Sequence, residues 1–237
     1  MANYTNMYPG SMSQGFLRKS LAESFLWMTG GLLVTAVVSY FFYSTGLLMS
    51  LLYRMPMFSM ILALIQFGLV IAFTAMMRTA SASTMKVLFL VYSATMGISL
   101  SSVLYVFDFG DITIAFVVSA FYFLCLAVLG FTTKRDLSKL GTICLAALIA
   151  LIISQVIMML FRVNMDVRLY SAIGLLIFTG LTAWDMQNLK QTLAQPALQG
   201  DLRDKCVIYF ALQLYLDFLN IFLYILQLIG AGSRSRN

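Results

Sequence analysis

The sequence predicts an all-α membrane protein with seven transmembrane helices, the seventh of which is central and wrapped by the other six. Two features of the composition support this class: 61% of the 237 residues are hydrophobic, and only 10% are charged. Soluble domains contain about 45–50% apolar and about 25% charged residues. The third observation is that seven separate stretches are apolar and long enough to cross a bilayer. This composition excludes a disordered or fibrous protein and argues strongly against a soluble enzyme.

Each predicted span has about the 20 residues that a helix needs to cross the hydrocarbon core. Helices are expected because every backbone polar group must find its partner within the chain inside lipid. The spans are predicted at residues 21–43, 57–77, 87–107, 112–132, 140–161, 169–189 and 206–229. One transmembrane domain therefore covers residues 21–230, between a polar N-terminal tail (1–20) and a short C-terminal tail (231–237).

The positive charges between the spans predict the orientation, because cytoplasmic loops carry an excess of Lys and Arg. With a cytoplasmic N-terminus, ten such residues lie inside and five lie outside. The inner set is Arg18, Lys19, Arg78, Lys86, Lys134, Arg135, Lys139, Lys190, Arg203 and Lys205, and the outer set is Arg54, Arg162, Arg168, Arg234 and Arg236. The C-terminus is therefore predicted outside. The net charge of +6 reflects topology, so no nucleic-acid partner is expected.

Several kinds of catalytic and cofactor chemistry have no residues to support them. The chain contains no histidine, which removes the usual metal ligand, general base and pH switch. Its three cysteines lie in or beside apolar stretches without a CxxC pair, so no disulfide framework is expected. The phosphate-binding, dinucleotide-binding and zinc-protease motifs are absent from the sequence. We expect a protein that is not an enzyme and holds no cofactor.

Asp185 and Asp217 are the only acidic residues well inside predicted spans. Asp185 lies near the cytoplasmic end of the sixth span, and Asp217 lies about a dozen residues into the seventh, which is about 15 Å deep. An ionised Asp at the centre of a membrane helix costs about 2.5–3.5 kcal/mol. This cost favours a functional role as an ion path, a proton relay or a sensor. The alternative is a carboxyl group that only holds helices together through hydrogen bonds.

A polar stripe runs along the seventh span. Its members recur at i, i+4, i+7, i+11 and i+14 and therefore share one helix face: Gln213, Asp217, Asn220, Tyr224 and Gln227. Such a face cannot point to lipid, so we expect the seventh helix inside the bundle, with the stripe lining its interior or a wet cavity. The alternative is a set of interhelical hydrogen bonds, each worth about 0.6 kcal/mol.

Arg78 ends the second span on the predicted cytoplasmic side. It is either a membrane anchor or a cation that pairs with Asp185. An intramembrane aspartyl protease also uses two membrane aspartates, with a signature that resembles Tyr-Asp on one helix and Gly-Leu-Gly-Asp on a later one. Here the contexts are Trp-Asp185 and Tyr-Leu-Asp217, without a glycine at the second, which argues against a protease.

The two aspartates lie in motifs that are similar to those of a known family. The segment Thr182-Ala-Trp-Asp185-Met-Gln-Asn-Leu-Lys190 is similar to the pattern Thr-x-Tyr-Asp-x-Gln-x-Ile-Lys. The segment Ala211-Leu-Gln-Leu-Tyr-Leu-Asp217-Phe-Leu-Asn-Ile-Phe222 follows Ala-Leu-x-Leu-Tyr-Leu-Asp-Phe-Ile-Asn-Leu-Phe. With these motifs the chain resembles the Bax inhibitor superfamily. The resemblance covers residues 15–230, and the compact loops are typical of a bacterial member. An integral protein of the bacterial inner membrane is therefore expected.

The resemblance implies a seven-helix fold around the last helix and a calcium leak gated by pH through an aspartate pair. Asp185 and Asp217 match that pair, and they are also the expected ligands for a calcium ion. Arg78 matches an arginine that latches onto the sixth helix, although relatives often have several basic residues there. Trp184 replaces the common Tyr, which changes the neighbour of Asp185 but not the carboxylate.

The physics of such a pair agrees with gating by protons. Two carboxylates within about 4 Å in a desolvated site cannot easily both ionise, so they share a proton. The shared proton would bridge the sixth and seventh helices, and its loss would add negative charge that attracts calcium. Two other functions stay open: a proton-coupled cation exchanger, and a non-transporting protein that restrains a membrane protease or cell-death regulator. The expected partners are thus lipid, calcium ions, protons and, in the last case, another membrane protein.

Overall fold

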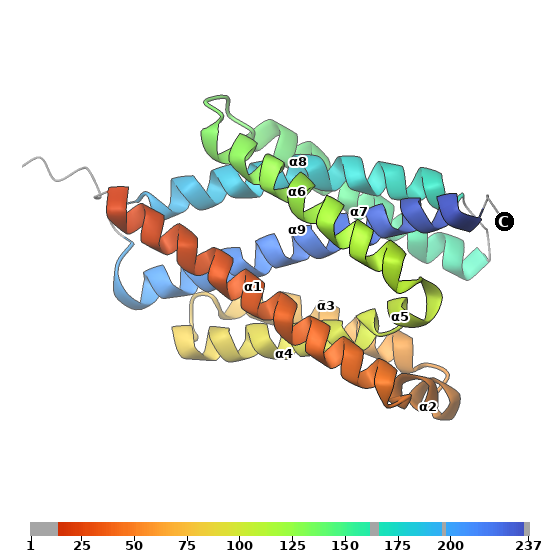
Figure 1. Cartoon of the computed structure of the whole chain (residues 1–237). Helices are drawn as coiled ribbons and strands as arrows, with labels where there is room; N and C mark the ends of the chain where they lie inside the picture. Colours follow the sequence, from red (N-terminus) through yellow and green to blue (C-terminus); the bar gives the residue numbers. More distant parts are fainter. Residues whose placement is uncertain (1–13, 162–165, 196–197, 235–237) are drawn as a thin grey trace, which may run out of the picture.

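The computed structural model describes residues 14–161, 166–195 and 198–234, and these residues form nine helices and no strand (Figure 1). The helices are α1 (Gln14–Ser44), α2 (Leu47–Arg54), α3 (Phe58–Met76), α4 (Ala82–Leu100), α5 (Val103–Val106), α6 (Phe109–Thr132), α7 (Ser138–Phe161), α8 (Val167–Leu193) and α9 (Gly200–Arg234). Seven spans in the described residues are long and apolar enough to cross a membrane, which confirms the predicted all-α membrane fold.

Two helices were not foreseen as separate elements. The eight-residue α2 is too short to cross a bilayer, and it follows Gly46, whose φ of +67° allows the chain to turn after α1. The predicted third span is one candidate crossing, Ala82–Val106, but the helix breaks at Ser101 and Ser102 into α4 and α5. Neither change alters the number of crossings.

Some helices extend beyond the predicted span ends. Residues 14–20 and 200–205, expected as tail and loop, belong to α1 and α9, and residues 231–234 continue α9. In the first turns of α9, Lys205 pairs with Asp201 at 2.9 Å across one helical turn, which supports helix in a polar stretch. The rest of the predicted tails, residues 1–13 and 235–237, lies outside the described residues.

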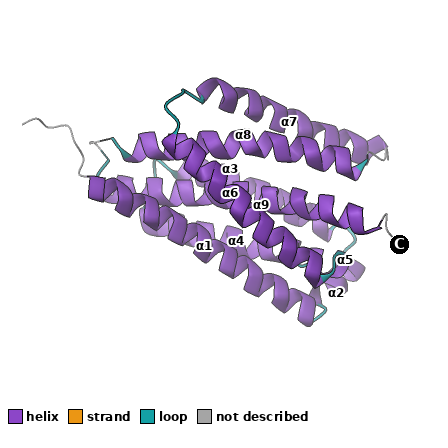
Figure 2. Cartoon of the chain, turned by 45° about the horizontal axis from the view of Figure 1, so that its top comes forward, coloured by secondary structure: helices purple, strands orange, loops and turns teal. Residues whose placement is uncertain are grey.

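Helix α9 forms the core of the bundle. It packs against α1, α4, α6 and α8, whereas α3 packs mainly on α4 and α7 on α8. Figure 2 shows α7 lying along α8 at one side of the bundle. Large side chains of α9 are completely buried, among them Ile208, Tyr215 and Ile221. Among the described spans α9 is therefore the most buried, while Gln213, Asn220 and Gln227 of the polar stripe are half-buried.

Close helix contacts hold α8 in place. A Cβ atom added at Gly130 of α6 would lie 2.2 Å from the Ala183 carbonyl oxygen of α8, so only glycine allows this approach. A Cβ atom added at Gly174 of α8 would lie 2.3 Å from the ring of Tyr224 on α9. Both contacts lie on the part of α8 that precedes Asp185, and they bring that part close to α6 and α9.

The arrangement carries a prediction about topology. Figure 1 shows the start of α1 and the α6–α7 and α8–α9 connections at one end of the bundle, and the end of α9 at the other. The charge count predicts that the first end faces the cytoplasm. We expect a reporter fused after Asn237 to be active only outside the membrane, and one inserted after Asp136 only inside. A cytoplasmic signal from the Asn237 fusion would contradict the predicted orientation.

Candidate functional site

Asp185 of α8 and Asp217 of α9 meet inside the bundle. Their exposed fractions are 6% and 4%, and the two carboxyl groups are close enough to interact directly. Ionised carboxylates only accept hydrogen bonds, so a bond between two carboxyl groups requires a proton on one of them. The arrangement is therefore compatible with a pair that shares one proton.

The pair is not fully satisfied by hydrogen bonds. Oδ1 of Asp185 and Oδ2 of Asp217 are buried and have no hydrogen-bond partner among the described residues. The hydroxyl of Thr182, one turn before Asp185, lies beside the Asp217 carboxyl group and also lacks a partner with good geometry. A buried polar group without a partner costs about 1–3 kcal/mol. A contact that served only to hold α8 on α9 gains nothing from such unpaired atoms.

The depth of the pair follows from the positions of the two residues along their helices. Asp217 lies 17 residues after the start and 15 before the end of the span Gly200–Gly232, which places it at the middle of the crossing. Asp185 lies eight residues before the end of α8, about 12 Å along the helix. An ion or proton that reaches the pair from the α8–α9 end therefore has half of the membrane to cross.

Arg78 is not in contact with this pair. It lies in the turn after α3, is exposed, and forms no ion pair with any described residue. It borders a cavity of about 440 Å³ between the ends of α3, α8 and α9, together with Thr192, Cys206 and Tyr209. Tyr209 is also close enough to Asp185 to interact with it electrostatically. The cavity thus lies on the side of the aspartate pair that Arg78 faces. The latch between Arg78 and Asp185 of α8 stays a prediction.

The outer part of the polar stripe is engaged with α8. Ser171 donates a hydrogen bond to Oε1 of Gln227 at 2.7 Å. The ring of Tyr224 lies 6.2 Å from that of Tyr170 and 5.9 Å from that of Phe178, measured between centroids. These contacts are the interhelical bonding that the alternative interpretation of the stripe proposes.

The rest of the polar stripe makes fewer hydrogen bonds to other helices. Asn220 donates to the Leu216 carbonyl of its own helix at 2.7 Å, a bond that joins no second helix. Oε1 of Gln213, one turn before Asp217, is buried and has no partner among the described residues. Polar atoms available to an ion or water therefore gather in the inner half of α9, around Asp217.

An ion pair that the sequence did not suggest joins α1 to the first turns of α9. Nη2 of Arg203 lies 2.6 Å from Oε2 of Glu23, and its Nε donates to Oγ of Ser20 at 2.9 Å. Arg203 also pairs with Asp204 at 2.9 Å. From the sequence, Arg203 was recognisable only as a cation in a loop. No sequence pattern relates it to Glu23, which lies 180 positions earlier. This cluster of polar side chains holds α1 against α9 at the end of the bundle.

Two further residues of α8 fix the α6–α7 connection. Gln187 accepts a hydrogen bond from the Leu137 backbone N–H at 2.9 Å and donates to the Arg135 carbonyl at 2.8 Å. Lys190 donates to the Phe131 carbonyl at 2.7 Å. Both residues belong to the sequence motif around Asp185. This motif is the feature of the sequence from which their importance could have been predicted. They position the end of α8 that carries Asp185.

The carboxylates do not form a complete calcium cage on their own. Within the described residues no cluster of three or more Cys, Asp or Glu side chains could hold a metal ion. Calcium takes six to eight oxygen ligands. A calcium ion at Asp185 and Asp217 would therefore need hydroxyl, carbonyl or water oxygens as well.

Comparison with known proteins covers both aspartate helices. Residues 17–234 match the family described as inhibitor of apoptosis-promoting Bax1. The inner membrane protein YbhL of Escherichia coli K12 is 37% identical over 219 residues, which cover 90% of this chain and 92% of YbhL. A protein of Borreliella burgdorferi described only as uncharacterised is 37% identical over 212 residues, covering 90% of this chain and 91% of that protein.

Proposed function

The chain belongs to the Bax inhibitor family of membrane proteins, and from this premise we propose that it is a pH-sensitive calcium leak channel. The observation that carries the proposal is the buried pair of Asp185 on α8 and Asp217 at the middle of the central helix α9, with an unpaired oxygen on each carboxyl group. The name of YbhL assigns that relative to the inner membrane, and we place this protein there too.

The proposed gate is the shared proton. While it is present, it bridges α8 and α9 and leaves a single negative charge. When it is lost at higher pH, two like charges face each other in a desolvated site and repel. The bridge then opens, and the additional charge attracts a divalent cation. Calcium flux should therefore rise as pH rises.

The packing of the bundle allows such a change. The helices α8 and α9 form the most extensive contact of the bundle, whereas α3 is held mainly by α4. A movement of α3 would open the cavity beside Arg78, Cys206 and Tyr209 without separating α9 from its other neighbours. In this mechanism α3 controls access from the cytoplasmic side, and the aspartate pair controls passage at the midplane.

The test is calcium flux through the purified protein in lipid vesicles that contain a calcium-sensitive dye. We expect slow entry at about pH 5 and faster entry at about pH 8, without a requirement for a proton gradient. Flux that occurs only with a proton gradient would establish the exchanger instead. If the protein alone carries no calcium at any pH, the non-transporting interaction protein becomes the better account.

Arg78 offers a separate prediction. If it restrains the α3 end near Tyr209, Arg78→Ala should raise calcium flux at acidic pH and shift the pH dependence, while Arg78→Lys should lie between this variant and wild type. Arg54→Ala is the matched control, because Arg54 is an exposed cation in the last turn of α2. The measurement is the vesicle flux profile against pH. A profile that stays unchanged in both Arg78 variants would identify Arg78 as a membrane anchor.

A further inference from the structure

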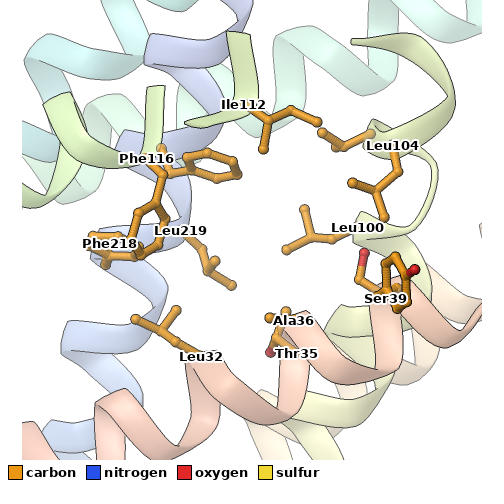
Figure 3. A pocket seen from close by; sticks show the side chains of 13 residues that line it. Leu32, Thr35, Ala36, Ser39, Leu100, Leu104, Ile112, Phe116, Phe218 and Leu219 are labelled. Carbon is orange, nitrogen blue, oxygen red and sulfur yellow. The ribbon is translucent and has the colours of Figure 1, made fainter. Parts of the chain in front are cut away.

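A second cavity lies away from the aspartate pair and has a different chemical character. Its volume is about 210 Å³, it is open on one side, and it is bordered by α1, α4, α5, α6 and α9 (Figure 3). Apolar side chains form most of its wall, among them Leu32, Leu100, Phe116, Phe218 and Leu219. Both α1 and α6 pack on α9 but are not packed along each other, which leaves this space between them.

The surroundings of the cavity are hydrocarbon. Every lining residue belongs to a span that is long and apolar enough to cross the membrane. Beside the cavity, α1 exposes Leu33 and Val37 (62% and 68%), and α6 exposes Val117 and Phe121 (48% and 68%). Side chains of this kind on a membrane-spanning helix face lipid. Lipid chains are therefore the molecules that surround the gap between α1 and α6.

One buried polar side chain in the wall has no hydrogen bond. Ser39 of α1 has an exposed fraction of 7%, lines the cavity, and takes part in none of the hydrogen bonds of the described residues. Thr35, one turn earlier, is different: its hydroxyl donates to the Ser93 carbonyl at 2.9 Å and is hydrogen-bonded to the Tyr215 hydroxyl at 2.6 Å. Among the buried side chains of the wall, the Ser39 hydroxyl is therefore the free hydrogen-bond donor; the other unbonded hydroxyl of the wall, that of Tyr40, belongs to a residue that is 61% exposed.

The polar and apolar parts of the cavity are ordered along the membrane normal. Ser39 lies five residues before the end of α1, whereas Leu32 lies seven residues further into the span, about 10 Å deeper. Phe218 directly follows Asp217, at the middle of α9. The cavity thus has a hydrogen-bond donor near the membrane surface and an apolar part towards the midplane. A phospholipid has the same arrangement, because its ester lies nearer the membrane surface than its acyl chain.

We propose that this cavity binds one acyl chain of a bilayer phospholipid. The chain lies between α1 and α6 along Leu32, Phe116 and Phe218, and its ester carbonyl accepts a hydrogen bond from Oγ of Ser39 (Figure 3). An apolar cavity of about 150 Å³ holds a benzene molecule, so the space here suffices for part of a chain. The site is independent of the proposed ion path, because its wall contains no ionisable acid or base apart from Tyr40.

The test uses a phospholipid that carries a diazirine on its acyl chain, in vesicles of phosphatidylethanolamine and phosphatidylglycerol with the full-length protein. After irradiation, labelled residues are identified by mass spectrometry. We expect label on Phe218, Leu219 and Phe222, which are at most 8% exposed and lie on the central helix. Lipids on the outer surface of the bundle reach residues such as Leu33 and Val37 instead.

Three variants decide between a bound chain and surface lipid. Ser39→Ala removes the hydroxyl without breaking a protein hydrogen bond and should lower labelling of α9 about two- to tenfold, the effect of one hydrogen bond. Ala36→Trp narrows the cavity and should abolish that labelling. Ala150→Trp, at an exposed position on α7, is the matched control and should leave it unchanged.

Several outcomes would overturn the proposal. They are label confined to Leu33 and Val37, equal labelling of α9 in wild type and both cavity variants, and labelling of α9 by a photoreactive free fatty acid but not by the phospholipid. Crosslinks between two protein chains through α1 and α6 would show that a second copy fills the gap. If Ala36→Trp fails to fold, Ser39→Ala decides alone. The readout is labelling, so the result does not depend on whether the protein carries calcium.

Discussion

Replacing Asp217 with asparagine is expected to abolish the pH dependence of calcium flux. The remaining carboxyl group, Asp185, then has no like charge beside it with which to share a proton. Asparagine keeps a similar shape, and its amide donates a hydrogen bond to Asp185 without needing a shared proton. The ratio of flux at about pH 8 to flux at about pH 5 should fall to about one, while the protein still folds and inserts.

Asp185→Asn should move or remove the same transition, with a smaller effect, because Asp217 lies at the middle of the central helix and Asp185 nearer the end of α8. Asp136→Asn is the matched control. Ser138 donates to the Asp136 carboxylate through its hydroxyl (2.6 Å) and its backbone N–H (2.9 Å), which holds the pKa of Asp136 below its usual range. Asp136 therefore stays ionised across the assay, and its removal should not change the pH profile.

A result in which both single variants keep the wild-type pH profile would show that the carboxylates do not form the sensor. The pair would then serve to hold α8 on α9, and the variants should instead differ from wild type in thermal stability. Measuring the melting temperature of each variant beside its flux separates these two roles.

Gly130→Val is expected to have the largest effect on stability. The new Cβ atom would lie 2.2 Å from the Ala183 carbonyl oxygen and 2.9 Å from Cβ of Met186, so the backbone of α8 itself has to move. Overpacking of this kind costs about 1–3 kcal/mol. We expect a melting temperature several degrees below that of wild type in detergent, and a smaller decrease for Gly130→Ala.

Gly68→Ala in α3 is the control, because nothing lies within 4 Å of a Cβ atom added there. Alanine is better than glycine inside a helix by about 0.5–1 kcal/mol, so this variant should melt at or slightly above the wild-type temperature. If Gly130→Val melted like Gly68→Ala, the close contact between α6 and α8 would not be what positions Asp185.

Much of the fold was predictable because the signals that specify it are local. Hydropathy over about 20 residues is sufficient to find spans, and all seven predicted crossings are present in the described residues. The stripe on the seventh span predicted a helix enclosed by others, since polar groups cannot face lipid. The short α2 and the break between α4 and α5 were missed, because hydropathy averaged over about 20 residues does not detect features that are only a few residues long.

The site was predictable to the extent that charge in a membrane is rare. Asp185 and Asp217 stood out as the only acids well inside apolar spans, and the structure brings them into contact. The ion pair of Arg203 with Glu23 was not found, because both residues lie near span ends, where charges are common. Which loop cation meets which acid is decided by helix packing across 180 residues of chain.

The sequence by itself determined that this protein lies in a membrane, how many times it crosses and which two acidic residues lie well inside its spans, because transfer free energies depend on residue type and on short windows of chain. Tertiary structure alone decided the rest. The contact between α6 and α8 at Gly130, the position of Arg78 away from Asp185, and the cavity beside Ser39 depend on how seven helices fit together. In lipid this fit is set by van der Waals packing and close backbone approach, and neither quantity can be calculated from one helix without its neighbours.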